Sequence, residues 1–95
     1  MRIDWKDAAK IDASAILAYI AQNDLAAAYG VYHKIHQQTL MLAEFPQIGR
    51  KGRVKGTREL LVSQTPYIVA YRVGKNAVQI LRILHSARNW PEQLE

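Results

Sequence analysis

The sequence predicts an α+β fold in which a helical hairpin packs on one face of a small twisted antiparallel sheet, in the order β-α-α-β-β-β. Two apolar stretches at helical spacing meet near residue 23 and predict the hairpin. Three runs rich in β-branched and aromatic residues follow, at residues 58–63, 67–73 and 77–85. The turn segments between them are short, which favours antiparallel pairing. With 95 residues, the chain forms one domain over 1–95.

The N-terminal segment predicts a short strand followed directly by a helix. Residues 2–5 place Ile3 and Trp5 on the same face of this strand. Asp7 is expected to cap a helix that continues to about residue 22. The apolar stripe of this helix consists of Ala9, Ala13, Ile16, Leu17 and Ile20.

Two adjacent residues are expected to end the first helix and begin the second. Asn23 suits a left-handed C-terminal position, and Asp24 can cap a helix from residue 25 to about residue 44. Pro46 disfavours helical geometry at Phe45 and so ends the helix before it. The apolar side of this second helix consists of Ala28, Tyr32, Ile35, Thr39 and Leu42.

The C-terminal half begins with a loop at residues 47–56, which contains three Gly and four basic residues and has no periodicity. In the last strand, regular alternation separates the side chains of Arg82 and His85 unless a bulge or the strand end intervenes. Both faces of the two long strands are largely apolar. We therefore expect the helices to cover one face and another segment to cover part of the second, and residues 86–95 to fold back on the body. Val78, Ile80, Arg82 and Leu84 are predicted to share one face, and Gln79, Leu81, Ile83 and His85 the other.

The composition limits the classes of function. There are 13 Lys and Arg against 8 Asp and Glu, a formal charge of +5, which favours an anionic partner such as nucleic acid, an acidic protein or a membrane surface. No Cys is present, so disulfides and thiolate metal sites are excluded. The sequence contains neither a signal peptide pattern nor a membrane-spanning run. We expect a cytoplasmic protein without a membrane partner.

Basic residues are the strongest chemical feature. Flexible Lys and forked Arg side chains on a Gly-rich loop can follow a phosphate backbone, although a solvated loop that aids solubility is an equal alternative. Arginines within apolar strands are costly unless paired or used in binding. A structural pair with Asp4, Asp7 or Glu44 is the favoured interpretation for Arg72, and both interpretations stay open for Arg82. The residues expected to bind nucleic acid or another target are Arg50, Lys51, Arg53, Lys55, Arg72 and Arg88.

A metal-independent RNA cleavage site would need an acid or base and cations for the phosphate. His85 can transfer protons near neutral pH, and Arg58, Arg82 and Arg88 can hold the phosphate, with Tyr67 or Tyr71 stacking on a base. The alternative is that His85 merely ends a strand and hydrogen-bonds to the backbone or tail. His33 and His36, three residues apart, suit a solvated helix surface better than a metal site. No phosphate-binding loop, dinucleotide fingerprint, nucleophile elbow or metalloprotease motif is present, so no cofactor or metal is expected.

Several segments, in this order and spacing, resemble the RelE/ParE superfamily of bacterial toxins from type II toxin–antitoxin modules. They are the first strand ending at Trp5, the helical hairpin, FPQIGR at 45–50, GTREL at 56–60, PYIVAYRV at 66–73 and ILRILHSARNWP at 80–91. The resemblance implies a small twisted antiparallel sheet packed against two helices. It also implies a cognate antitoxin that wraps a disordered segment over the toxin and blocks it.

The superfamily contains poisons of DNA gyrase and ribosome-dependent mRNA endonucleases. An apolar last strand that ends in His85 before a polar turn resembles the ParE branch, and the chain lacks the C-terminal Tyr of some nucleases. The resemblance therefore favours gyrase as the partner, with the ribosome and mRNA as the alternative. If the chain is a nuclease, Arg58, Arg82 and His85 are the candidate catalytic residues. A degenerate toxin that only binds its antitoxin is a third interpretation.

Overall fold

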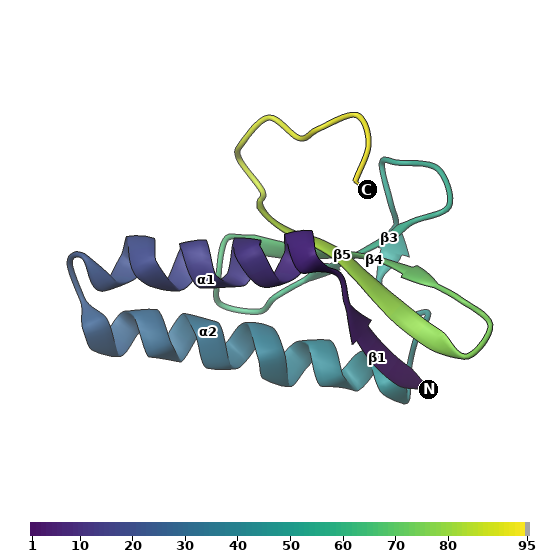
Figure 1. The fold of residues 1–95 in the computed structure, drawn as a ribbon, viewed down its shortest axis with the longest axis horizontal. Coiled ribbons are helices and arrows are strands. Elements are labelled where there is room, and N and C mark those ends of the chain that lie inside the picture. The colour runs from purple at the N-terminus through teal and green to yellow at the C-terminus, as the bar shows by residue number, and fades with distance from the viewer. Residues whose placement is uncertain (95) are drawn as a thin grey trace.

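A computed structural model describes residues 1–94, and in it two helices pack on one face of a five-stranded sheet (Figure 1). The predicted fold class is confirmed. The C-terminal tail arches over the sheet on the side away from the second helix (Figure 1). None of the helices among these residues is long and apolar enough to cross a membrane. The elements are β1 (Arg2–Trp5), α1 (Asp7–Ala21), α2 (Leu25–Leu40), the 3-10 turn η1 (Met41–Ala43), β2 (Arg50–Lys51), β3 (Arg58–Leu61), β4 (Tyr67–Val73) and β5 (Ala77–His85).

The sheet has the strand order β1-β5-β4-β3-β2. The predicted antiparallel pairs of β3 with β4 and of β4 with β5 are present. Two features differ from prediction. The first strand joins the sheet parallel to β5. The helical hairpin returns the chain to the end of the sheet where β1 begins, and the later strands continue from there. Part of the predicted basic loop is the short edge strand β2, where Arg50 pairs with Glu59.

The start of α1 differs from the predicted cap. Lys6 is the N-cap residue and its side chain makes no capping bond, whereas Asp7 is the first helical residue. The backbone amide of Lys6 donates to the Ile80 carbonyl at 2.9 Å, so the sheet fixes the chain where the helix begins. Asp7 still favours this end of the helix, because its carboxylate lies near the positive end of the helix dipole.

The hairpin between the helices is partly as predicted. Asp24 caps α2 by accepting a bond from the Ala27 amide at 3.0 Å. Asn23 does not adopt the left-handed conformation expected, since Gln64 is the non-Gly residue with a positive φ among residues 1–94. Instead the amides of Asn23 and Asp24 both donate to the Ile20 carbonyl, which closes the helix end without a left-handed residue. The last predicted turn of α2 is the 3-10 turn η1.

The main core lies between the helices and the sheet. Ala9 and Ile16 of α1 and Ile35 of α2 pack there against Val69 and Tyr71 of β4. The side chains of β4 alternate between the two faces, because Ala70 packs on the opposite face. All residues of the two predicted apolar helix stripes are buried or partly buried.

The alternation predicted for β5 is wrong beyond Ile80. Ile80 pairs with Tyr71 and Arg82 pairs with Ala70, so Leu81 is an extra residue at a β-bulge. The bulge exchanges the faces of the residues that follow. Ile83 therefore joins Ile80 in the main core.

The second face of the sheet is covered by the tail, as expected. Leu94 is 5 % exposed and packs with Ala70 and Leu81, with Leu84 and Trp90 at the margin. The tail consequently brings residues from the very end of the chain next to the middle of the sheet.

Candidate functional site

A cleft of about 430 Å³ opens between α1, the end of β5 and the tail. It exists because β1 pairs only with the first part of β5, up to Ile80, and leaves the rest of that strand edge without a neighbouring strand. Ile16 and Tyr19 line the cleft from α1, and Trp90 lines it from the tail. Arg82, His85 and Arg88, all identified from the sequence, line it as well.

Arg82 is held in this cleft by Asp12 of α1. The Arg82 guanidinium donates from Nε to Oδ2 at 2.6 Å and from Nη2 to Oδ1 at 3.0 Å. The pairing with Asp12 raises the pKa of Arg82, against the opposing effect of burial. For Arg82 the predicted partners Asp4, Asp7 and Glu44 are wrong, because Asp12 is the carboxylate that faces the open edge of β5.

His85 lies at the end of β5 with its ring edge-on to Tyr67, at 5.5 Å between centroids. Its Nδ1 accepts a bond from the Ala87 amide at 3.1 Å. Burial raises the pKa of Tyr67, and the charge of Arg88 partly opposes this effect. The Arg88 guanidinium is 6.0 Å from the centre of the Tyr19 ring. The cleft thus combines aromatic walls with one imidazole and one exposed cation.

Arg58 stands apart from this cleft. Its Nη1 donates to the carbonyls of Gly49 at 2.8 Å and Gln47 at 3.4 Å. Arg58 belongs to β3, which is separated from β5 by β4 in the sheet. The structure therefore brings together Arg82 and His85 but not Arg58. The side chains of Arg82 and His85 lie on opposite faces of β5. Both still reach the cleft, because the cleft lies along the edge of this strand.

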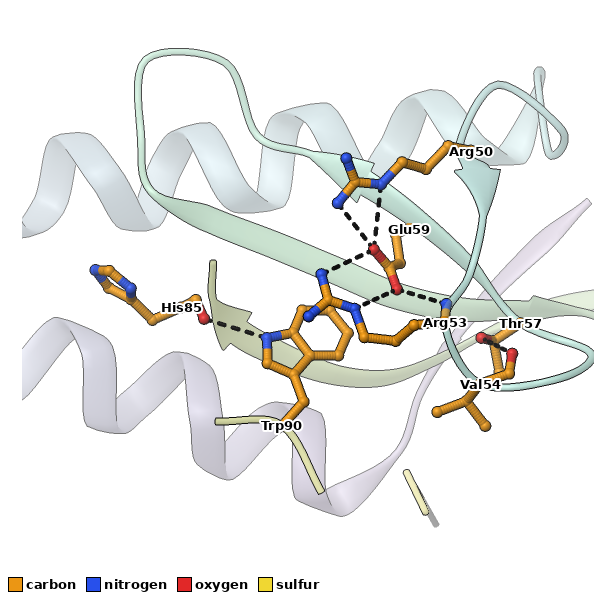
Figure 2. A network of polar contacts seen from close by, with 7 residues as sticks. All are labelled: Arg50, Arg53, Val54, Thr57, Glu59, His85 and Trp90. Carbon is orange, nitrogen blue, oxygen red and sulfur yellow. Dashed lines mark hydrogen bonds and ion pairs between the residues drawn. The ribbon is translucent and has the colours of Figure 1, made fainter. Parts of the chain in front are cut away.

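A second cluster surrounds Glu59 of β3, whose side chain is only 3 % exposed (Figure 2). Arg50 donates to Oε1 from Nε at 3.2 Å and from Nη2 at 3.0 Å. Arg53 donates to Oε2 from its amide at 2.9 Å and from Nε at 3.1 Å. Burial alone would raise the pKa of Glu59, but the hydrogen bonds from Arg53 and Arg50 outweigh it and lower that pKa. One carboxylate thus orients two guanidinium groups.

Trp90 joins the two regions. The Arg53 guanidinium lies over its indole at 3.6 Å from the ring centre, and the indole Nε1 donates to the His85 carbonyl at 3.2 Å (Figure 2). Lys55 and Arg72 line a smaller depression of about 180 Å³ with Leu94. Lys51 is exposed on β2.

Sequence reasoning missed three important residues of these sites: Asp12, Glu59 and Trp90. Asp12 lies next to the buried residue Ala13 of α1. A carboxylate at such a position indicates that the element packed against the helix supplies a positive charge. Glu59 alternates with apolar side chains in a strand next to a basic loop, which is a comparable signal. The role of Trp90 depends on how the tail folds and has no local signal.

His36 is also placed differently from the expectation of a solvated surface. Its ring stacks on Trp5 at 4.7 Å and contacts Tyr32 at 4.5 Å between centroids. Burial lowers its pKa. Among residues 1–94, no group of three His, Asp or Glu side chains is arranged to hold a metal ion.

The fold and the order of the segments agree with a family of known proteins. Residues 3–90 match the family model described as the ParE toxin of the type II toxin–antitoxin system parDE. This chain belongs to the ParE toxin family. It is therefore a ParE-like type II toxin within the RelE/ParE superfamily, as the sequence resemblance implied.

Individual relatives agree with this assignment. A protein of Sinorhizobium fredii that carries the toxin name Y4kP is 41 % identical over 98 % of this chain and 96 % of its own length. Toxin RelE2 of Caulobacter vibrioides is 36 % identical over 92 % of this chain and 97 % of its own length. A structure of the chromosomal ParDE system from P. aeruginosa matches with a TM-score of 0.82 and 27 % identity, over 90 % of this chain and 95 % of that one.

Proposed function

We propose that this ParE-like toxin arrests bacterial growth by inhibiting DNA gyrase and that a cognate antitoxin neutralises it. Membership of the ParE family is the observation that carries the proposal. The structure of a ParDE system as a neighbour supports an antitoxin partner. In this proposal the toxin acts by binding, so it needs no catalytic group.

Exposed apolar side chains support the antitoxin part of the proposal. On α1 of the helical hairpin, Ile11 is 68 % and Tyr19 is 60 % exposed. Such side chains favour a partner segment that folds on binding and buries them. Other large exposed apolar residues are Met1, Leu25, Tyr29, Leu40, Met41, Phe45, Ile48 and Leu61.

Neutralisation can be tested by growth of cells that express toxin and antitoxin together. We expect Ile11→Asp with Tyr19→Asp to weaken protection, because two charges would oppose burial of this helix side. Asn76→Asp adds a charge at an exposed position of the β4–β5 turn, away from this helix, and is the control. If the double variant remains toxic by itself and the antitoxin still fully protects the cells, this side of α1 is not part of the antitoxin interface.

The arrangement of the candidate catalytic residues supports binding over cleavage. The Arg82 guanidinium is engaged by Asp12, and Arg58 contacts loop carbonyls away from the cleft. A phosphate clamp would have to break the Arg82 pair before it could act. This arrangement favours gyrase inhibition over nuclease activity.

A ribosome-dependent mRNA endonuclease is the second candidate. Arg82 and His85 line one cleft with Tyr67, and one relative carries the name RelE2. In this alternative, His85 would transfer a proton and Arg82 would stabilise the phosphate. His85→Gln is the informative variant, because glutamine keeps a hydrogen-bond acceptor but cannot transfer a proton.

The deciding experiment compares two purified systems. Under the gyrase proposal, the toxin inhibits supercoiling or traps cleaved DNA on gyrase, and His85→Gln retains much of this effect. Under the alternative, the toxin cuts mRNA on ribosomes and His85→Gln abolishes the cutting. An effect on translation without any effect on gyrase would reject the first proposal. Inactivity in both assays, with harmless overexpression, would indicate a chain whose task is antitoxin binding alone.

A further inference from the structure

The edge strand β2 and the loop from β2 to β3 together carry four cations at one edge of the sheet. Arg50, Lys51, Arg53 and Lys55 are all exposed, and no acidic residue occurs between Phe45 and Arg58. In Figure 1 this loop projects beyond the body of the protein near the C-terminus. Glu59 is the acidic side chain that neutralises part of this charge, and it is buried beneath the two arginines.

Glu59 also fixes the direction of the two guanidinium groups. The bonds to Glu59 use Nε and Nη2 of Arg50 and of Arg53. Because guanidinium is planar, the edge that includes Nη1 points away from the carboxylate. The Arg53 plane is further held against the Trp90 indole. The two arginines therefore present donors outward, with side chains that are already ordered.

The surroundings of these cations favour a polyanion over a protein segment. The exposed large apolar residues lie at or before Ile48 and at Leu61, so none occurs among residues 49–60. A bound protein segment usually inserts apolar or aromatic anchors into its interface. A phosphate backbone needs only charge and N–H donors, and arginine forks match its oxygens.

We propose that Arg50, Lys51, Arg53 and Lys55 form a binding site for the phosphate backbone of duplex DNA, with Glu59 as the positioning residue. The apolar side of the helical hairpin lies elsewhere, so the toxin can contact DNA and a protein partner through different surfaces. The proposal goes beyond gyrase inhibition and does not depend on it.

Binding is measured by fluorescence anisotropy of a labelled 20-base-pair duplex with the full chain, in the absence of gyrase and over a range of salt concentrations. Lys51→Gln with Lys55→Gln is the test variant, since both side chains are exposed. Lys10→Gln with Lys75→Gln changes the net charge equally at exposed positions of α1 and the β4–β5 turn and is the control. We expect the test variant to bind about tenfold more weakly and its salt slope to fall by about 2, with little change in the control.

Arg50→Lys tests the fork, because it keeps the charge and loses the planar donors. We expect it to bind several-fold more weakly than the unaltered protein. Equal weakening by the test and control pairs, or no binding of the duplex, would overturn the proposal. Unchanged affinity in Arg50→Lys would overturn the positioning role of Glu59. A poly-glutamate peptide that displaces the duplex at matched charge would assign the surface to an acidic protein instead.

Discussion

Asp12 of α1 and Arg82 of β5 form a bidentate ion pair across the open edge of the sheet. The same Oδ2 accepts the Ile83 amide at 2.9 Å, so one carboxylate satisfies both a side chain and a backbone group. Beyond the point where β1 ends, this carboxylate accepts a hydrogen bond that a neighbouring strand would otherwise accept.

Loss of the Asp12 charge should destabilise the fold. Asp12→Asn leaves the Arg82 guanidinium, which is 27 % exposed, without its counter-charge. We expect the free energy of unfolding in urea to fall by about 1 to 3 kcal/mol. Glu44→Gln, an exposed position, should change it by less than about 0.5 kcal/mol. Equal stability of the two variants would show that the pair contributes nothing net.

Glu59 should make stability depend on acid pH. Its folded-state pKa is lowered from 4.5, so the unfolded chain binds more protons in the acid range. The stabilisation is present above about pH 4.5 and is lost as pH falls through the folded-state pKa. Urea unfolding at pH 6, 5, 4 and 3 should show a steeper loss in the unaltered protein than in Glu59→Gln. Parallel profiles would contradict this account.

His36 should make the free energy of unfolding depend on pH in a higher range than Glu59 does. Burial lowers the pKa of His36 from 6.5, so protonation favours the unfolded chain. The stability of the protein therefore declines as pH falls below about 6.5. Its Nε2 is buried and has no hydrogen-bond partner among the described residues. His36→Phe keeps an aromatic ring on Trp5 and removes the titration. Unfolding between pH 7.5 and 5.5 should therefore depend less on pH in this variant, whereas His33→Phe, at an exposed position, should leave the profile unchanged.

Two glycines should respond in opposite directions to alanine. A Cβ at Gly49 would lie 2.5 Å from the Tyr71 hydroxyl, which accepts the Gly49 amide at 2.9 Å and donates to the Pro46 carbonyl at 2.8 Å. Gly49→Ala should therefore destabilise the protein by about 1 to 3 kcal/mol, through lost hydrogen bonds and overpacking. Gly30 in α2 has open space around it, so Gly30→Ala should stabilise by about 0.5 to 1 kcal/mol. Thermal unfolding of the two variants measures both effects, and an unchanged or raised stability of Gly49→Ala would refute the packing at Gly49.

Local patterns in the sequence determined the helices, the strands β3, β4 and β5, and the cap at Asp24. They did so because apolar spacing, turn residues and capping side chains act over a few residues, and the motifs from Trp5 to Pro91 carried the family resemblance. The parallel pairing of β1 depends on where the hairpin returns the chain, which is a long-range property.

Only the tertiary structure decided the chemistry of the basic residues. The bulge at Leu81 turned Ile83 into the core, and packing of α1 brought Asp12 to Arg82 from 70 positions away in the chain. Folding of the tail likewise set Trp90 against Arg53. A charged side chain takes its partner from whichever element packs beside it, so its role follows from contacts that no local pattern contains.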